Sequence, residues 1–138
     1  MSFTLDPRLA ADTAVVGDLA LSRVLILKDA RDPWLVLTPR RAGLVELDDL
    51  GPDELSRLTQ EIAMATRAMR GFAGVEKINV GALGNIVRQL HVHVVGRRVG
   101  DDAWPGPVWG AGHAAVYETA ELDVRRVWFA DQLQIKEG

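Results

Sequence analysis

The sequence contains no cysteine and only three histidines among its 138 residues. The absence of cysteine excludes disulfide bonds, thiolate nucleophiles and cysteine-ligated zinc, and it is compatible with a reducing cytoplasm. No run of about 18 apolar residues is present, so a transmembrane helix is not expected. The first residues, MSFTLDPRLAAD, lack a basic segment followed by a long apolar one, so a secretion signal is not expected either. A cytoplasmic location is therefore predicted.

Neither sign of charge is in large excess, because 16 Lys and Arg face 19 Asp and Glu and give a formal net charge of −3. This balance does not favour nonspecific binding to nucleic acid or to an anionic membrane. Internal repeats, low-complexity stretches and long linkers are also missing from the sequence. The length suits one domain with a core, and we expect a single domain over 1–138, with its core at about 15–110 and a C-terminal extension at 111–138.

Three helices are predicted from caps and from apolar residues at spacings of three and four. The clearest begins near Pro52, with Asp53 and Glu54 at the positive end of its dipole, and stops at Gly71. Its apolar stripe indicates a face that packs against a sheet. The other two helices are expected at Asp6–Asp12, where an aspartate precedes a proline, and at Thr119–Leu133.

Runs rich in Leu, Val and Ile predict strands on either side of the long helix. Two of them flank a turn at Asp29–Pro33 and indicate an antiparallel hairpin. Two more follow the helix and are separated by a Gly-Asn turn. Short connections favour antiparallel pairing, so the expected fold class is α+β. The strands are predicted at Leu19–Asp29, Trp34–Arg40, Val75–Leu83 and Arg88–Val95.

Two of the three histidines lie two residues apart in the segment RQLHVHVVGRR, Arg88–Arg98. Side chains alternate between faces along a strand, so Gln89, His91 and His93 are expected on one face. The intervening apolar residues are expected to pack under the helix. A solvated face is more simply built from Lys, Glu or Thr, so two imidazoles on one face indicate a functional site.

Three kinds of site fit this pair of imidazoles. A His-x-His strand can supply two metal ligands, but a third ligand is not evident, since His113 lies beyond a glycine-rich loop. Histidine can act as a general acid or base near neutral pH. A neutral imidazole can also attack a phosphorus or acyl centre. The sequence offers no Gly-x-Ser-x-Gly elbow and no P-loop that would supply another nucleophile or phosphate cradle.

The segment QLHVHVVGRR resembles the signature of the histidine triad (HIT) family, His-φ-His-φ-His-φ-φ, in which φ is apolar. Gln89 replaces the first histidine, and His91 and His93 match the second and third. LVLTPRR, INVGALGN and WPGP are also similar to family segments, so the resemblance covers about Val15–Gly110. It implies an α+β fold with an antiparallel sheet of about five strands, a main packed helix, a C-terminal helix and a homodimer.

The resemblance also implies a nucleotide-binding hydrolase or nucleotidyl transferase that acts at the α-phosphate. His91 would be the nucleophile that forms a nucleotidyl-histidine intermediate, with its second ring nitrogen bonded to the backbone of Gln89. His93 would contact the phosphate, and Gln89 would keep an orienting role. Expected substrates are dinucleoside polyphosphates or nucleoside phosphoramidates. No cofactor is required, although a divalent cation such as Mg²⁺ can accompany a polyphosphate. A nucleotide-binding sensor or interaction module without turnover is the alternative.

Other positions match the family less closely. Asn79 resembles the family asparagine on the strand before the triad, and Asn85 lies where a polar amide contacts the phosphate region. Both are expected to bind substrate, and Asp29 lies near the place of an acidic residue that binds the ribose. Ile86 stands where many members carry a hydroxyl, and Ala42 stands where some carry a histidine. Further interpretations assign Arg40 and Arg41 to a polyphosphate, Trp104 and Trp109 to a base or to the dimer, and His113 to a surface role.

Overall fold

A computed structural model describes residues 2–135, and its framework is one antiparallel sheet with the strand order β1-β2-β3-β5-β4. This confirms the predicted α+β class and the five-stranded antiparallel sheet. The strands are β1 (Thr13–Asp18), β2 (Ser22–Leu27), β3 (Trp34–Pro39), β4 (Lys77–Gly81) and β5 (Val92–Arg97). The helices are α1 (Pro7–Asp12), α2 (Pro52–Arg70) and α3 (Thr119–Gln132), with a 3₁₀ turn η1 (Leu47–Asp49).

The predicted hairpin is present as β2 and β3, and its register runs from Ser22 opposite Pro39 to Ile26 opposite Leu35. The strand β1 was not predicted as a separate element. A bulge interrupts its pairing with β2 between Val15 and Gly17. That irregularity breaks the two-residue alternation on which strand prediction depends.

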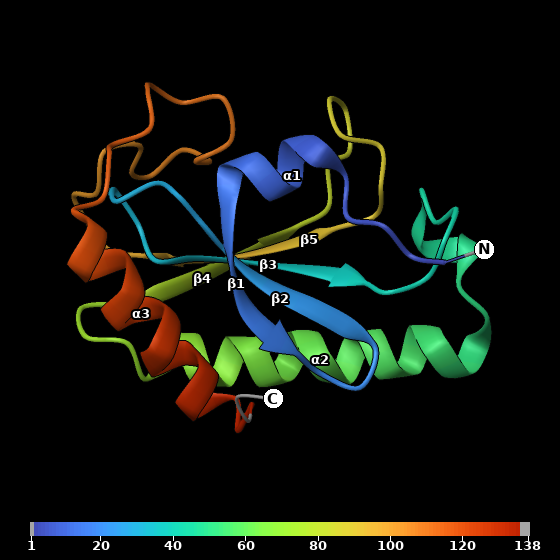
Figure 1. Cartoon of the computed structure of the whole chain (residues 1–138). Coiled ribbons are helices and arrows are strands. Elements are labelled where there is room, and N and C mark those ends of the chain that lie inside the picture. Colours follow the sequence, from blue (N-terminus) through green and yellow to red (C-terminus); the bar gives the residue numbers. More distant parts are fainter. Residues whose placement is uncertain (1, 136–138) are drawn as a thin grey trace.

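The helix α2 covers one face of the sheet, as its apolar stripe predicts, and Figure 1 shows it running along the underside. Its residues Leu58 and Met69 are fully buried, Leu58 packing with Val92 and Met69 with Val94. One buried residue of α2 is charged. The carboxylate of Glu61 accepts hydrogen bonds from the backbone amides of Leu21 and Ser22 at 2.8 and 2.9 Å, and so ties the helix to the turn between β1 and β2.

The opposite face of the sheet is covered by α1 and by the long loop that follows β5 (Figure 1). Leu5 from the N-terminal segment and Val108 and Trp109 from the loop pack there around Trp34 and Val36. This second apolar cluster is the layer in which His93 lies, because His93 pairs with Val36 across the sheet. The two faces of β5 are therefore different, one packed under α2 and the other facing the loop.

The last predicted strand is shorter than expected. It was predicted over Arg88–Val95, but β5 begins at Val92, so Gln89 and His91 precede the strand. The chain leaves the ladder here because Leu90 donates its amide to Leu44, in the loop after β3, rather than to a neighbouring strand. The prediction that Leu90, Val92 and Val94 pack on the helix side is confirmed.

The helix α3 belongs to the main core. Phe129 and Leu133 join the apolar cluster that includes Val24, Leu35 and Met69. Phe129 is fully buried, stacked on Phe72 with ring centroids 5.6 Å apart. The segment after residue 110, predicted as an extension, thus supplies part of the interior. Within residues 2–135, no helix is both long enough and apolar enough to cross a membrane.

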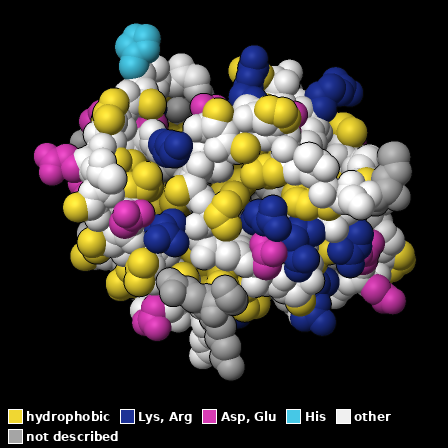
Figure 2. Space-filling model, viewed as in Figure 1, with side chains coloured by type: hydrophobic (Ala, Val, Ile, Leu, Met, Phe, Trp, Pro, Cys, Tyr) yellow, Lys and Arg dark blue, Asp and Glu magenta, His cyan; other side chains and the backbone are white. Residues whose placement is uncertain are grey.

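The surface carries charges of both signs. Figure 2 shows basic and acidic side chains interspersed on one face, with hydrophobic side chains between them. Several of the ion pairs are local, such as Arg23 with Asp18 across the β1–β2 turn and Arg125 with Glu121 within α3. Exposed pairs of this kind contribute little to stability, so the fold depends on its two apolar layers.

The substitution Gly96→Ala is expected to lower the free energy of unfolding by about 1–3 kcal/mol. A Cβ at this position would lie 2.7 Å from Val75 Cγ2, 2.8 Å from Met69 Sδ and 2.9 Å from Pro33 Cγ. Urea unfolding measures the change. The matched control is Gly71→Ala at the end of α2, where the backbone is helical and the nearest atoms lie at 3.4 Å or more. Equal stability of the two variants would contradict the expectation.

Candidate functional site

His91 lies directly before β5 and is 6% exposed. Its Nδ1 is 2.6 Å from the carbonyl oxygen of Gln89, where the family resemblance places the acceptor. A carbonyl can only accept a hydrogen bond, so Nδ1 must carry the proton. The neutral ring then has its lone pair on Nε2. The backbone of the preceding segment thereby selects the nucleophilic tautomer of His91.

A cavity of about 320 Å³ lies beside His91. One wall comes from the loop that contains η1, and the other from the loop between β4 and β5. The lining is apolar apart from His91 and two carboxylates, and no lysine or arginine is among the described residues that form it. These residues are Val45, Glu46, Leu47, Asp48, Ala82, Leu83, Gly84, Leu90 and His91.

His93 packs against His91 with ring centroids 4.9 Å apart. The indole of Trp34 donates a hydrogen bond from Nε1 to His93 Nδ1 at 2.9 Å, and Trp109 packs on the imidazole at 5.8 Å between centroids. Burial, together with repulsion from His91, lowers the pKa of His93 to about 4. His93 is therefore neutral at physiological pH. No role was predicted for Trp34, since a tryptophan at the start of a strand is usually a packing residue.

The side chain of Gln89 does not point at the imidazoles. Its Oε1 accepts the amide of Asp6 and its Nε2 donates to the carbonyl of Thr4, both at 2.8 Å. The predicted orienting role therefore falls to the backbone carbonyl of Gln89, while its carboxamide fastens the N-terminal segment. That segment brings Leu5 to the apolar cluster around Trp34.

Asn79 lies on β4, and its side chain is hydrogen-bonded to a buried arginine. Its Oδ1 accepts a hydrogen bond from Arg97 at 2.8 Å. The guanidinium of Arg97 is 1% exposed, pairs with both oxygens of Asp101 and also donates to the carbonyl of Gly106. Asn79 thus helps to position Arg97, and Arg97 holds the loop that packs over His93. Arg97 was not predicted as a buried residue, although Asp101 lies only four positions after it.

The cluster around Arg97 contains a second carboxyl group. Hydrogen bonds from Arg97 lower the pKa of Asp101 to about 2. Burial and the nearby charge of Asp101 raise the pKa of Asp32 to about 6.

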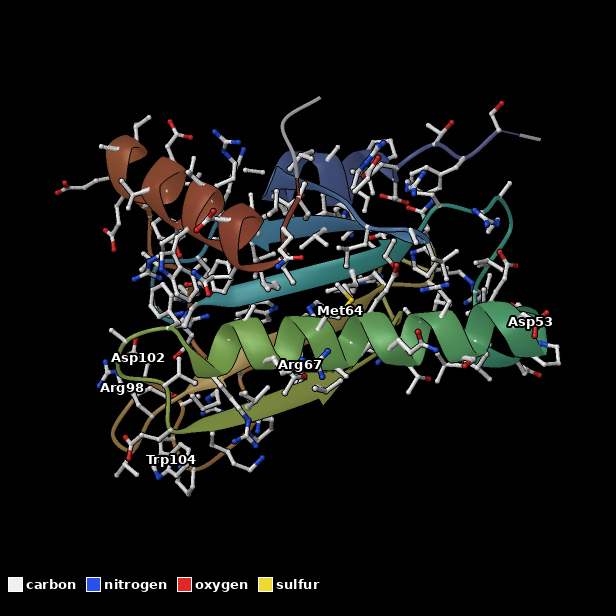
Figure 3. All side chains as sticks on the ribbon, turned by 90° about the horizontal axis from the view of Figure 1, so that it is seen from below. Asp53, Met64, Arg67, Arg98, Asp102 and Trp104 are labelled. Carbon is white, nitrogen blue, oxygen red and sulfur yellow. The ribbon has the colours of Figure 1, made fainter. Side chains whose placement is uncertain are left out.

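This charged cluster lies far from the start of α2. Figure 3 shows Arg98, Asp102 and Trp104 at one end of the molecule and Asp53, at the start of α2, at the other. His91 precedes β5 and Arg97 ends it, so the charged cluster and the imidazoles lie at opposite ends of the strand.

Asp29 is buried, and its carboxylate is bound by other groups of the protein. It pairs with Arg31 at 2.8 Å and accepts the amide of Ala115 at 3.1 Å. Burial raises its pKa, but these hydrogen bonds outweigh that effect and leave the pKa below its usual value. Arg31 also donates to the carbonyl of Ala111. The residue predicted to bind a ribose thus holds the segment before α3 against the β2–β3 turn in this structure.

The remaining predicted residues lie away from the imidazoles or are engaged elsewhere. Asn85 is exposed in the β4–β5 loop and is not among the residues that line the cavity. Arg40 donates to the carbonyls of Leu19 and Ala20, and Arg41 pairs with Glu54. Two of the positions that differ from the family pattern are on the surface, since Ile86 is 76% exposed and Ala42 is exposed as well.

Trp104 and Trp109 have different surroundings. The ring of Trp104 lies 5.6 Å from the guanidinium carbon of Arg97, whereas Trp109 packs on His93. His113 is exposed in the loop before α3. Within residues 2–135, no three His, Asp or Glu side chains are grouped so that they could hold a metal ion.

The chain was compared with known protein families, curated proteins and solved structures. A family model described as the HIT domain matches residues 8–100. A search of curated proteins gave no match.

Several solved structures of histidine triad proteins are similar to this chain in both sequence and fold. A histidine triad protein from Bradyrhizobium japonicum is 42% identical, with a TM-score of 0.89 and coverage of 97% of each chain. One from Sinorhizobium meliloti is 45% identical, with a TM-score of 0.88 and coverage of 96% of this chain and 95% of the other. One from Marinobacter aquaeolei VT8 is 38% identical, with a TM-score of 0.93 and coverage of 97% and 98%. The similarity thus extends over nearly the whole chain.

Proposed function

The chain belongs to the histidine triad (HIT) family, and from this membership we propose that it is a nucleotide-binding hydrolase or nucleotidyl transferase acting through His91. The observation that supports a catalytic function is the 2.6 Å contact between His91 Nδ1 and the carbonyl of Gln89. This contact leaves the lone pair of Nε2 available beside a cavity. A module that only binds nucleotides does not need a nucleophilic nitrogen, such as His91 Nε2, with its lone pair accessible.

In the proposed reaction His91 Nε2 attacks the α-phosphorus of a bound nucleotide. The bond from phosphorus to the leaving group breaks, and its electron pair departs with that group, which takes up a proton from solvent when it is an amine. The nucleotidyl-imidazole carries a positive charge, and its Nδ1–H continues to donate to the carbonyl of Gln89. Water, or another hydroxyl acceptor in a transferase, then bonds to phosphorus and releases a proton to solvent, while the phosphorus–nitrogen bond breaks and its electron pair returns to Nε2 of the neutral imidazole. His93 donates a hydrogen bond to the phosphoryl oxygens as their charge changes.

The cavity favours a leaving group without much negative charge. Its polar lining includes the carboxylates of Glu46 and Asp48, which would repel a polyphosphate. The arginines predicted to meet a polyphosphate, Arg40 and Arg41, are bound to other parts of the protein. Apolar side chains such as Leu47 and Leu83 make up much of the remainder. Of the two expected substrate classes, a nucleoside phosphoramidate with an amine leaving group therefore fits better than a dinucleoside polyphosphate.

We expect kcat/KM for a nucleoside phosphoramidate to exceed that for a dinucleoside polyphosphate by at least about tenfold, a difference of 1.4 kcal/mol in transition-state binding. Both substrates carry label at the α-phosphate and are tested with and without Mg²⁺. Alkali-stable label on the wild-type protein identifies the nucleotidyl-histidine. The variant Asp48→Asn removes one carboxylate from an exposed position in the cavity. It should reduce the ratio between the two values of kcat/KM, because the polyphosphate is then repelled less.

Two outcomes would contradict the proposal. A preference for the polyphosphate would contradict the assignment of the leaving group. Saturable nucleotide binding without label or product, over a panel of both substrate classes, would instead favour the alternative of a binding module. In that case the carbonyl contact of His91 would be a structural feature.

A further inference from the structure

Trp34 is the first residue of β3 and is 5% exposed. Its indole N–H lies 2.9 Å from His93 Nδ1. An indole nitrogen can only donate, so Nδ1 of His93 must be the acceptor and cannot carry a proton. The single proton of the neutral ring is then on Nε2. The partner of His93 is a donor and the partner of His91 is an acceptor, so the two neighbouring imidazoles are held in opposite tautomers.

The same hydrogen bond opposes protonation of His93. A cationic imidazole carries protons on both nitrogens, and its Nδ1–H would face the N–H of Trp34. The other groups packed around the ring do not favour a cation either. Val36 on β3, Gly81 on β4 and Trp109 on the loop are uncharged, and the ionisable neighbour, His91, repels a positive charge. Arg97 ends the same strand, but its charge is paired with Asp101.

A donor without charge suits the proposed reaction. When His91 is nucleotidylated its ring becomes positively charged, and the His93 ring lies 4.9 Å away between centroids. A second positive charge at this distance would oppose formation of the intermediate. A neutral ring with Nε2–H still donates to the phosphoryl group without this repulsion.

We propose that Trp34 is a positioning residue that holds His93 as the neutral Nε2–H tautomer and so provides an uncharged hydrogen-bond donor beside the nucleophile. This inference rests on the proposed function for its catalytic meaning. The tautomer itself can be measured without any substrate, so the two can fail separately.

The test compares Trp34→Phe with Trp109→Phe in protein labelled with ¹⁵N-histidine. Both variants keep an aromatic ring against His93 and lose one indole N–H. Only the indole of Trp34 is bonded to the imidazole, because Trp109 Nε1 has no hydrogen-bond partner within the described residues. Long-range ¹H–¹⁵N NMR spectra give the tautomer and the pKa of each ring.

In the wild type and in Trp109→Phe, His93 should show the Nε2–H tautomer and remain neutral at pH 5.5. In Trp34→Phe the tautomers should mix, and the pKa should rise, while burial and His91 keep it below the ordinary value of about 6.5. A larger fraction of His93 would then be protonated at pH 5.5, so kcat at that pH should fall relative to the wild type by the factor by which the neutral fraction falls, at most about tenfold. At pH 7.5 the two values of kcat should be similar.

An unchanged tautomer and pKa in Trp34→Phe, or an equal change in Trp109→Phe, would overturn the inference. A shifted pKa with an unchanged pH profile of kcat would overturn the catalytic part, because the charge on His93 would then not affect the reaction. If the wild type turns over no substrate, the proposed function fails, and the NMR spectra still decide whether Trp34 fixes the tautomer.

Discussion

Replacing His91 by alanine is expected to abolish both the alkali-stable label and turnover, with a loss of about 10⁴-fold or more in kcat. The other two positions of the triad are not expected to replace it, because Gln89 points its carboxamide at the N-terminal segment and Nδ1 of His93 accepts the indole N–H of Trp34. The chain has no cysteine that could take over. The measurement is single-turnover hydrolysis of an α-labelled nucleoside phosphoramidate, followed by alkaline quench.

Two controls separate loss of chemistry from loss of structure. His91→Asn keeps an N–H group that can donate to the carbonyl of Gln89, and it should fold and bind nucleotide product within a fewfold of the wild type. His91→Gly leaves a space beside the cavity, and added imidazole should restore part of the turnover. Full activity in His91→Ala would rule out the nucleophilic role.

Replacing Arg97 by methionine is expected to lower the free energy of unfolding by about 3–5 kcal/mol, the usual cost of removing one partner of a buried ion pair. The substitution leaves Asp101 with a buried charge and removes the donors to Asn79 and Gly106. Because the loop after β5 covers His93, Trp109 fluorescence should also report loosening of that layer. Urea unfolding monitored by circular dichroism measures the stability.

The double variant Arg97→Met with Asp101→Leu provides the control. If the loss comes mainly from an unpaired buried carboxylate, removing that carboxylate should recover a large part of it. A loss in Arg97→Met that the double variant does not reduce would show that packing and the bonds to Asn79 and Gly106 dominate. A loss below about 1 kcal/mol would contradict the central position of Arg97, since that is the range of an exposed ion pair.

Much of the architecture follows from local patterns. The stripe on α2, the aspartate–proline start of α1 and the alternation through Val92 and Val94 each depend on residues a few positions apart. The two triad histidines were recognised from the same kind of short-range spacing. The Gln89 carbonyl partner of His91 followed from the family resemblance, and only Leu90 lies between the two residues.

The contacts that escaped prediction join distant segments of the chain. Trp34 meets His93 across 59 positions, and Asp29 meets Ala115 across 86. Spacing along one strand cannot indicate such partners. Arg97 was overlooked because a basic residue after an apolar run is usually solvated, whereas here Asp101 accompanies it into the interior. The start of β5 at Val92, later than predicted, likewise follows from the hydrogen bond between Leu90 and the loop after β3.

Gln89, at the first position of the triad, has a structural role, because its carboxamide binds the N-terminal segment. A carboxamide presents a donor and an acceptor side by side, and here they match the carbonyl of Thr4 and the amide of Asp6 as a neighbouring strand would. An imidazole holds its two nitrogens on opposite sides of a rigid ring and cannot reproduce that pairing. A histidine at residue 89 would therefore replace this pair of hydrogen bonds with a titratable group and release the amino-terminal stretch from the apolar cluster to which it contributes Leu5.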